Sequence, residues 1–357
     1  MIYSLNWGII GAGNISGQFV HDLCMNNANS TDFKHIIRSI GSSSKDKGEK
    51  FIAEHSIFDK NNFHIRPVAE TYEEVFNNEQ VNIVYLGTPH PFHKQQAIQA
   101  FNCGKHVLCE KPATINANDL TELIQLAKSK NLFFMEAVWT RFFPSIDLIK
   151  NYIFCEQILG ETRRLFVDFS YDEEIEKLPP TSRVRDINLG GGALLDIGIY
   201  TITYARILLD DKLAPFNTDF QIKAALMIDK VDKVDYLCSI LLNYETGKHA
   251  VLTASNILKG KEPFLRLEGT KGQLEIFSSN PAAPKKFKII FNDGSKPIEY
   301  EDESSYLGFI YEANAIAKDI AESNIENSLM PTQESLLVMK IMDEVRKQNG
   351  LVYPQEK

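Results

Sequence analysis

The feature that most constrains this chain is an alternation of short apolar runs with helix-like stretches over residues 5–137. The apolar runs are continuous rather than interleaved with polar residues, which is typical of strands buried on both faces. Helices between such strands cover the two faces of a parallel sheet, so this half predicts a doubly wound α/β domain. Strands are expected at Leu5–Ile10, His35–Ile40, Val81–Gly87, His106–Glu110 and Leu132–Ala137.

After Val138 the hydrophobic period becomes two. In "RRLFVDFSY" every second residue from Leu165 to Tyr171 is apolar, and "DYLCSILLNY" repeats this pattern up to Tyr244. Such alternation indicates antiparallel strands with one covered face. The second domain is therefore expected to be an α/β unit with an open, mainly antiparallel sheet, whose uncovered face suits a homodimer interface. Further strands are expected over residues 221–228, 250–255, 264–268 and 273–277, with a hairpin turn at "EGTKGQ".

At 357 residues the chain exceeds what one hydrophobic core usually serves. The change of period predicts one domain over residues 1–137 and another over residues 138–357. A last helix is expected over "TQESLLVMKIMDEVRKQN", ended by Gly350, and packing back on the first domain is one option for it.

Composition argues against several classes of protein. The formal net charge of −9 does not favour a nucleic-acid partner. No apolar run reaches the roughly 18 residues of a membrane span and no signal peptide is visible, so a soluble, cytoplasmic protein is expected. The five cysteines lack CxxC spacing and the eight histidines lack ligand spacing, so neither a disulfide framework nor a metal site is predicted.

The stretch "GIIGAGNIS" joins the first expected strand to the first helix. Gly11 permits a tight turn, and Gly13 lets backbone N–H groups approach a pyrophosphate. Asn14 and Ile15, at the start of the helix, are also expected to contact the cofactor. Ser16 replaces the third glycine of G-x-G-x-x-G and weakens the match. An ordinary strand-to-helix turn is the alternative, but the position after the first strand favours a dinucleotide site.

The stretch "SIGSSSKDKGEK" after the second strand bears on which dinucleotide binds. An acid there would bind the ribose diol of NAD, whereas its absence leaves room for the 2′-phosphate of NADP. Ser42 and Ser43 offer hydroxyl groups, Lys45 offers a cation, and the first acid, Asp46, falls at the next helix start. NADP is therefore favoured, with NAD as the alternative. A plain turn with an N-cap serine fits "GSSS" equally well.

The stretch "HVLCEKP" ends a buried strand with Glu110, Lys111 and Pro112. Ligands of doubly wound sheets lie beyond the carboxyl ends of strands, where Lys111 is expected. Oxidising an alcohol requires a group that takes the hydroxyl proton and a cation that steadies the oxygen, and Lys111 suits either task. Glu110 would hold its ammonium. A lysine at a strand end is otherwise usually a solvated surface residue.

With "GIIGAGNIS", the "EKP" motif resembles the signature of the glucose–fructose oxidoreductase, inositol dehydrogenase and MocA family. The likeness continues through "VYLGTPHPFHKQQAIQAFNCGKHVLCEKP", "MEAVWTRFFP" and "GGGALLDIGIY". The last two stretches resemble the dimeric dihydrodiol dehydrogenases and NADP-dependent D-xylose dehydrogenases of that family. The resemblance implies an N-terminal Rossmann domain, a C-terminal open-sheet domain that forms dimers, and an active-site lysine at Lys111, followed by a commonly cis proline bond.

In "GGGALLDIGIY", Asp196 and Tyr200 are four residues apart and are expected on one helical face. A phenol has a pKa of about 10, so a neighbouring ammonium, for which Lys111 is the expected source, would be needed near neutral pH. The resemblance assigns the family's acidic residue to Asp196 and the acid/base tyrosine of the dihydrodiol subgroup to Tyr200, where many relatives carry histidine. The residues alone are also compatible with a buried Tyr200 whose hydroxyl group forms a hydrogen bond with Asp196.

Weaker candidates complete the predicted site. The resemblance implies that the substrate lies near Arg183, Trp139 and Phe143. Residues expected near the cofactor are Thr88, His93, Glu110, Lys111 and Arg141, with His90 or His93 capping the next helix as an alternative. The aromatic stretch "WTRFFP" also fits simple core at a domain junction.

The predicted function is an NADP-dependent oxidoreductase that transfers hydride between its cofactor and a sugar or cyclic diol. Lys111, Tyr200 and Asp196 are its predicted catalytic residues. A D-xylose-like aldose and a trans-dihydrodiol both remain open, because pocket loops set that choice. The alternative is a non-catalytic dinucleotide sensor, since the galactose-pathway repressors share the fold, although a sensor would not need the lysine and tyrosine together.

Overall fold

The computed structural model describes residues 3–29, 33–57, 62–216 and 218–356. The chain forms two compact units. The first comprises Met1–Thr114, Asn118–Trp139 and Ser305–Thr332, and the second comprises Ile115–Ala117, Thr140–Ser304 and Gln333–Lys357. The chain therefore crosses between the units more often than a single boundary after residue 137 implies.

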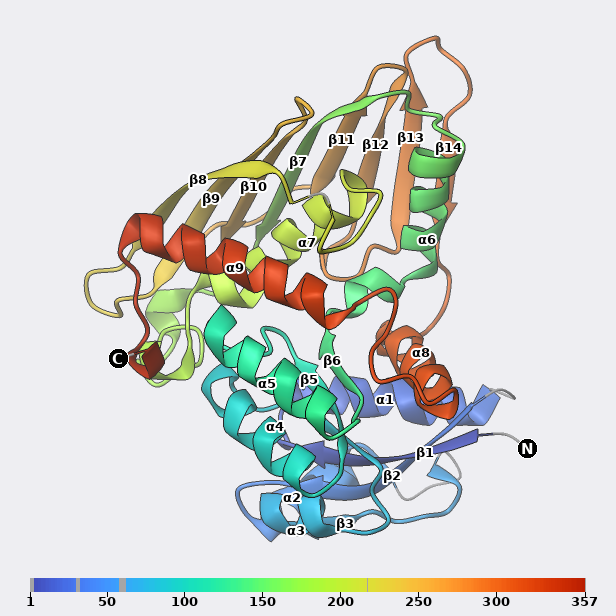
Figure 1. The fold of residues 1–357 in the computed structure, drawn as a ribbon, viewed down its shortest axis with the longest axis vertical. Coiled ribbons are helices and arrows are strands. Elements are labelled where there is room, and N and C mark those ends of the chain that lie inside the picture. Colours follow the sequence, from blue (N-terminus) through green and yellow to red (C-terminus); the bar gives the residue numbers. More distant parts are fainter. Residues whose placement is uncertain (1–2, 30–32, 58–61, 217, 357) are drawn as a thin grey trace. The chain divides into compact units, whose positions relative to one another are not determined.

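The first unit is built on a six-stranded sheet in the order β3-β2-β1-β4-β5-β6 (Figure 1). Every neighbouring pair of strands runs parallel. This is the strand order of the Rossmann fold and confirms the predicted doubly wound sheet. The strands are β1 (Tyr3–Ile10), β2 (Phe33–Gly41), β3 (Val68–Glu70), β4 (Ile83–Leu86), β5 (His106–Glu110) and β6 (Phe134–Ala137).

The central strands of this sheet are buried along nearly their whole length. All residues of β4 and β6 are buried, as are all but the first of β5. Continuous apolar runs thus mark strands with two covered faces, as expected from the sequence. The helices that connect the strands are α1 (Asn14–Asn29), α2 (Lys45–Glu54), α3 (Tyr72–Asn77), α4 (His93–Asn102) and α5 (Ala117–Ser129).

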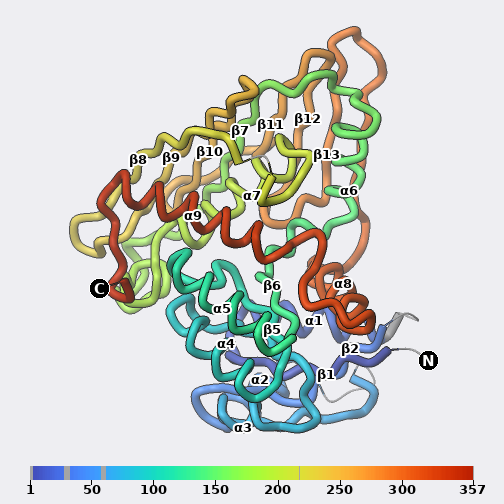
Figure 2. Tube along the Cα trace, viewed as in Figure 1, coloured from blue at the N-terminus to red at the C-terminus, as the bar shows by residue number. Residues whose placement is uncertain are grey.

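A helix that the sequence analysis did not predict, α8 (Phe309–Ala321), returns to the first unit and lies beside α1 (Figures 1 and 2). Phe309 stacks on Trp139 with ring centroids 4.3 Å apart and meets Phe19 edge-on. Phe19 in turn stacks on Tyr85 of β4 at 4.1 Å. α8 therefore contributes an aromatic residue to the core of this unit. The terminal helix is α9 (Thr332–Asn349), and its packing on the first unit stays a prediction.

The second unit is built on an eight-stranded sheet in the order β14-β13-β12-β11-β7-β10-β9-β8. Neighbouring strands are antiparallel except β7 and β10, which run parallel. The predicted mainly antiparallel sheet is thereby confirmed. Its strands are β7 (Thr162–Ser170), β8 (Phe220–Ile228), β9 (Asp235–Tyr244), β10 (His249–Ser255), β11 (Leu265–Gly269), β12 (Gly272–Phe277), β13 (Lys286–Phe291) and β14 (Ile298–Glu301).

One face of this sheet is covered, as the period of two predicted. Figure 1 shows α6 (Pro144–Lys150), α7 (Ile199–Leu208) and α9 on one side of the sheet, and α7 contacts β7 and β10. On β9 the inward residues Cys238, Ile240 and Leu242 are buried, whereas the alternate residues Ser239 and Leu241 are partly exposed. The outer face therefore remains open within the unit.

Side-chain amides from α9 occupy the backbone groups of the edge strand β8. Ala224 N–H donates to the side-chain oxygen of Gln348 and Leu226 N–H to that of Asn349, both at 3.0 Å. The Gln348 amide returns a hydrogen bond to the Ile222 carbonyl oxygen at 3.0 Å. Covering an edge in this way prevents unwanted strand pairing.

The terminal helix α9 spans 18 residues and carries Glu334, Arg346 and Lys347 in its first and last turns. In the described part of the chain, no helix has both the length and the apolar character needed to cross a bilayer.

Candidate active site

Lys111 follows β5 in a segment whose backbone is held by buried side chains. The carboxylate of Glu136 on β6 accepts the Ala113 N–H at 2.8 Å, and Nδ1 of His93 lies 2.9 Å from the Pro112 carbonyl oxygen. The Lys111–Pro112 peptide bond is cis, as the family resemblance implied. Lys111 thus stands on a fixed backbone at the carboxyl end of a parallel strand, where ligands of such sheets bind.

His93 is completely buried and joins two loops of the first unit. Its Nε2 lies 2.7 Å from the Thr88 carbonyl oxygen, and its Nδ1 faces Pro112. Burial lowers the pKa of His93, and the Lys111 ammonium lowers it further, although the two carbonyls act in the opposite direction. A neutral imidazole has one N–H and donates to only one of these carbonyls at a time. The structure thus shows a positioning role, and a cofactor contact by Thr88 or His93 stays a prediction.

Buried acids surround the end of β5. Glu110 accepts hydrogen bonds from the Tyr85 hydroxyl at 2.6 Å and from the Lys111 N–H at 3.2 Å. Glu312 on α8 is fully buried, and burial together with Glu110 raises its pKa well above the ordinary range. The sequence analysis missed Tyr85, Glu136 and Glu312. The two acids do leave a signal, since they interrupt the apolar stretches "LFFMEA" and "FIYEANAIA" and acids are rarely buried without a reason.

The glycine loop after β1 has the shape that a pyrophosphate requires. Gly11 has a φ of +101°, and a Cβ there would lie 2.9 Å from the Gly87 carbonyl oxygen, so a side chain does not fit. The Gly11 N–H donates to the Gly41 carbonyl at 2.9 Å, which ties this loop to the end of β2. No other part of the described chain lies within 4 Å of a Cβ built on Gly13. Open space therefore faces the start of α1, where N–H groups favour an anion.

The first turn of α1 fits the same ligand. It consists of Asn14, Ile15, Ser16 and a glycine, so no acid repels a phosphate there. Ser16 replaces the third glycine of the motif and faces Gly87, where a Cβ would lie only 2.3 Å from the serine Oγ. The helix therefore packs closely on β4 despite the weaker motif match.

The serine turn after β2 caps the helix that follows it. Ser44 is the N-cap of α2, and its hydroxyl accepts the Lys47 N–H at 3.3 Å. Ser42 is buried and donates to the Ser44 carbonyl at 2.6 Å, whereas Ser43 is exposed. The N-cap reading is thus right for Ser44. Binding of a 2′-phosphate by Ser42 and Ser43 stays a prediction.

Lys45, the predicted cation for that phosphate, is paired with an acid. Its ammonium lies 2.9 Å from the carboxylate of Glu74 on α3, and both side chains are about half exposed. Glu74 also accepts the Thr71 N–H at 2.8 Å in a capping box. These two donors, the Thr71 N–H first, lower the pKa of Glu74 to about 2. The sequence analysis did not identify Glu74 as a partner of this site.

In the second unit, Asp196 and Tyr200 lie on one helix. The helix begins with a π-helical turn over Leu194–Gly198 and continues as α7. Such turns are rare and frequently occur at functional sites. The Tyr200 side chain is buried next to Phe169 on β7, with ring centroids 5.4 Å apart. The predicted helical placement of the two residues is therefore present, with a wider first turn than expected.

The start of this helix is held by Asp235 at the beginning of β9. The Leu194 N–H donates to the Asp235 carboxylate at 2.7 Å. Gly192 has a φ of +113°, and a Cβ there would lie 2.4 Å from the other carboxylate oxygen, which explains one glycine of the "GGG" run. Burial raises the pKa of Asp235 to about 6. Sequence reasoning missed this residue because its partner lies 41 positions away.

Arg183 and Asp196, both predicted, form an ion pair with 3.0 Å between the guanidinium and the carboxylate. The Asp196 side chain is only 11% exposed, so Arg183 reaches inward to meet it. Arg185, two residues further along, instead pairs with Asp232 at 2.7 Å. Tyr171 belongs to the same corner, because burial and nearby acids that include Asp196 raise its pKa to about 12. Sequence reasoning treated Tyr171 only as a strand residue.

The remaining candidates have buried side chains. Trp139 stacks on Phe309 in the first unit. In the second unit, Phe143 is 1% exposed, and Arg141 donates to Glu334 at 2.8 Å. The core interpretation of "WTRFFP" therefore has direct support, and contacts of these three residues with substrate or cofactor stay predictions.

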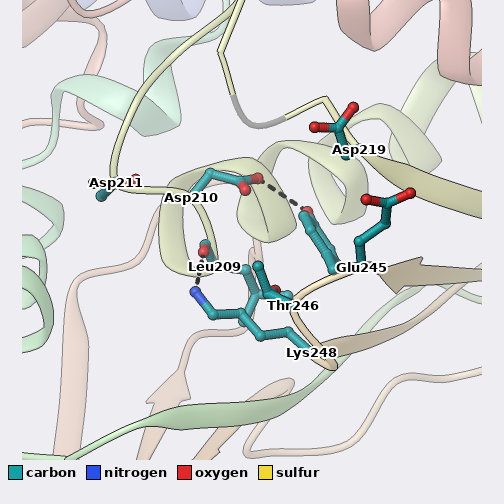
Figure 3. A pocket seen from close by; sticks show the side chains of 8 residues that line it. Leu209, Asp210, Asp211, Asp219, Glu245, Thr246 and Lys248 are labelled. Atoms are coloured by element: carbon teal, nitrogen blue, oxygen red, sulfur yellow. Dashed lines mark hydrogen bonds between the residues drawn. The ribbon is translucent and has the colours of Figure 1, made fainter.

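The second unit also contains a hollow of about 340 Å³ that has none of the predicted site residues in its lining. Figure 3 shows the Asp219 and Glu245 carboxylates at its rim, and Lys248 donates to the Leu209 carbonyl at 2.7 Å. Its buried acid, Asp210, pairs with Arg206 and accepts the Tyr244 hydroxyl. The hollow is therefore acidic, and its innermost carboxylate already has protein partners.

Comparison with known proteins identifies the family. Residues 5–138 match the oxidoreductase family with an NAD-binding Rossmann fold, and residues 153–275 match the GFO/IDH/MocA C-terminal domain. The D-xylose 1-dehydrogenase (NADP(+)) of Hypocrea jecorina is 31% identical over 99% of this chain and 94% of its own length. The chain belongs to the GFO/IDH/MocA family. It is therefore an NAD(P)-dependent oxidoreductase, as the sequence motifs predicted.

Other similar proteins agree with this assignment. The trans-1,2-dihydrobenzene-1,2-diol dehydrogenase of Mus musculus is 29% identical over 99% of both chains. Among solved structures, the 3-ketoreductase KijD10 of Actinomadura kijaniata, in complex with NADP and TDP-benzene, has a TM-score of 0.79 at 22% identity and covers 96% of this chain and 97% of its own. The aldose-aldose oxidoreductase of Caulobacter crescentus has a TM-score of 0.77 at 20% identity, covering 96% and 97%. The two structures show the shared fold.

Proposed function

We propose that this GFO/IDH/MocA protein is an NADP-dependent dehydrogenase that oxidises a hydroxyl-bearing carbon of a sugar or a cyclic diol. The observation that carries most weight is Lys111 at the carboxyl end of β5, in a Rossmann sheet whose glycine loop leaves open space for a pyrophosphate. The names of the Hypocrea and mouse relatives support D-xylose-like aldoses and trans-dihydrodiols as the substrate classes.

The chemistry requires both units. When bound, NADP accepts hydride from the substrate carbon. Tyr200 takes the hydroxyl proton as its phenolate and becomes a neutral phenol. The Lys111 ammonium favours the phenolate before this transfer and stabilises negative charge on the substrate oxygen. Asp196, which is paired with Arg183, accepts a hydrogen bond from the substrate and orients it. The proposal therefore depends on Lys111 of the first unit meeting Tyr200 of the second.

The preference for NADP rests on the end of β2. The sequence there, "GSSSK", offers hydroxyl groups and a cation and has no acid in the position that would bind the ribose diol of NAD. Both the Hypocrea relative and the KijD10 complex carry NADP in their descriptions. We expect Ser42, Ser43 and Lys45 to contact the 2′-phosphate.

The test is a spectrophotometric screen at 340 nm. Purified protein is incubated with NADP or NAD and with pentoses, hexoses and cyclic trans-diols, and formation of reduced cofactor is followed. We expect turnover with NADP and at least one sugar or diol, and product analysis then separates a lactone from a catechol. If no reduced cofactor forms with any compound of the panel although the cofactor binds tightly, the result would instead support the dinucleotide sensor.

We further propose that two copies of the chain associate through the open face of the eight-stranded sheet. The outer face presents partly exposed Phe166, Leu237, Leu241 and Val251. An apolar sheet face of this kind is typically covered by another subunit.

Light scattering at several protein concentrations tests this interface. We expect the wild type to be a dimer and Leu241→Lys to be a monomer. Val231→Lys is the control, because Val231 is an exposed valine in the turn before β9 and should leave the dimer intact. A monomeric wild type would contradict the proposed interface.

A further inference from the structure

Glu74 holds the cation that is expected to bind the 2′-phosphate. Lys45 is the first residue of α2 and directly follows the serine turn after β2. Its ammonium lies 2.9 Å from the Glu74 carboxylate. Glu74 comes from a separate element, α3, and the Thr71 N–H fixes it with a second hydrogen bond of 2.8 Å. The capping box thus keeps the negative charge of Glu74 next to the Lys45 ammonium. To bind a phosphate, Lys45 would have to leave this carboxylate.

The pair is exposed enough to be broken by a ligand. The Lys45 side chain is 57% exposed and that of Glu74 is 46% exposed. Exposed ion pairs of this kind contribute little to stability, so an anion with a larger charge competes effectively for the ammonium. A phosphate monoester carries a charge of about −1.5 to −2 at neutral pH and has three acceptor oxygens. The 2′-hydroxyl group of NAD carries no charge and has a single oxygen, so it leaves the ion pair between Lys45 and Glu74 intact.

We infer that Glu74 is a specificity-determining residue, which limits the preference for NADP over NAD by competing with the 2′-phosphate for Lys45. The inference deepens the proposed function and rests on its assignment of the cofactor site. The Glu74 carboxylate repels the 2′-phosphate of NADP and keeps Lys45 as its own ion-pair partner. It leaves the affinity for NAD almost unchanged, because NAD has no phosphate there. Cofactor preference is thus set by the balance between Lys45 and Glu74.

The test is the substitution Glu74→Gln, which removes the charge and keeps the capping box because glutamine also serves at this position. Dissociation constants for NADPH and NADH are measured directly, by the fluorescence of the reduced cofactors. We expect NADPH to bind about two to five times more tightly, which is the scale of exposed charge pairs, and NADH to change by less than about 1.5-fold. The gain should shrink as salt is added, because the Debye length falls.

Two further variants make the result specific. In a Lys45→Ala background, Glu74→Gln should have less than about half of its effect on NADPH, because the cation for which the carboxylate competes is gone. Glu54→Gln is the matched control, since Glu54 pairs with Lys50 at 3.6 Å on the same helix. It should leave the ratio of the two dissociation constants unchanged.

The outcomes separate this inference from the proposed function. An unchanged ratio in Glu74→Gln, or an equal gain in Glu54→Gln, would overturn the role of Glu74 while leaving the dinucleotide site intact. A wild-type protein that binds neither NADPH nor NADH would overturn the proposed function itself.

Discussion

The two halves of the proposed active site are Lys111 in the first unit and Asp196 with Tyr200 in the second, and a buried carboxyl group holds the backbone beside each of them. In the first unit, Glu136 accepts the Ala113 N–H at 2.8 Å and fixes the segment that bears Lys111. In the second unit, Asp235 accepts the Leu194 N–H at 2.7 Å and fixes the helix that bears Asp196 and Tyr200. The first segment follows a parallel strand, whereas the second begins a helix on an open sheet. A buried acidic side chain on a strand thus holds the backbone near the predicted catalytic residues in two unrelated architectures.

The halves differ in the charge that they present. The first half offers a cation, Lys111, and the second offers a phenol, Tyr200, and a carboxylate, Asp196, that is neutralised by Arg183. Proton removal from an alcohol needs both a base and a cation that stabilises it, so neither half suffices alone. If this comparison is right, substitutions in either half should abolish turnover while each unit stays folded.

The largest expected effect is that of Lys111→Ala. We expect turnover with the best substrate to fall by at least about a thousandfold, since the group that stabilises both the phenolate and the substrate oxygen is lost. Unfolding should stay cooperative, because Glu136 and His93 hold the backbone rather than the lysine side chain. Steady-state kinetics and urea unfolding measure the two properties.

Lys94→Ala is the control for charge. Lys94 on α4 pairs with Asp119 and Glu122 on α5 at the partly exposed surface of the same unit, and its loss should leave turnover near normal. Turnover of Lys111→Ala close to that of the wild type would remove Lys111 from the mechanism.

The next largest effect is expected in the other half, for Tyr200→Phe. Loss of a general base typically costs about a hundredfold to ten-thousandfold in turnover. Binding of NADPH, measured by fluorescence, should be unchanged because the proposed role concerns the substrate proton. Tyr204→Phe, one turn further along α7, is the control, since its hydroxyl donates to the Pro281 carbonyl at 2.6 Å.

The control should lose about 1 kcal/mol of stability and keep its turnover. Equal losses of turnover in the two variants would mean that α7 is simply sensitive to change. Only Lys111 in the first unit would then keep its proposed catalytic role, and Tyr200 would lose its own.

Much of the fold was predictable because the pattern of burial is local. The continuous run His106–Glu110 and the alternating run Asp235–Tyr244 match β5 and β9 residue for residue. The helix α8 was missed although its stretch is apolar, because its packing partners α1 and Trp139 lie far away in the sequence. Periodicity indicates that a segment is buried and leaves open which unit it joins.

The residues of the candidate site likewise fall into those that the sequence could predict and those that it could not. A lysine beyond a buried strand was predictable from the general rule for parallel sheets. Asp196 and Tyr200 needed the family resemblance, because a buried tyrosine on a helix is usually core. The anchors Glu136 and Asp235 and the competing Glu74 were not predicted, since each acts through one contact to a residue distant in sequence.

The smallest of the expected effects concerns the anchor in the second unit, Asp235. Burial raises its pKa in the folded chain to about 6 from an ordinary value of 3.8, although Arg346 and the Leu194 N–H act in the opposite direction. The folded state holds this proton more tightly than the unfolded chain does. The contribution of the Asp235 carboxyl group to the free energy of unfolding is therefore fully present below about pH 4 and is lost as the pH rises through 6. Tyr353 and Cys238 also face this carboxylate and stay neutral in that range, because burial raises the pKa of each well above its ordinary value.

Asp235→Asn should remove this pH dependence while keeping an oxygen for the Leu194 N–H. We expect the variant to gain about 2 kcal/mol of unfolding free energy relative to the wild type between about pH 4 and pH 7. Hydrogen exchange of the α7 amides, compared between the two proteins at each pH, measures the difference at the helix itself.

Asp232→Asn supplies the opposite case three residues earlier. Arg185 and Tyr236 lower the pKa of Asp232, so its contribution to stability is already present above about pH 4 and is lost only at lower pH. That variant should therefore be destabilised by a nearly constant amount from pH 4.5 to pH 7. A parallel pH response of the two variants would show that Asp235 is not protonated in the fold, and the anchor would then be a charged carboxylate at the start of a buried helix.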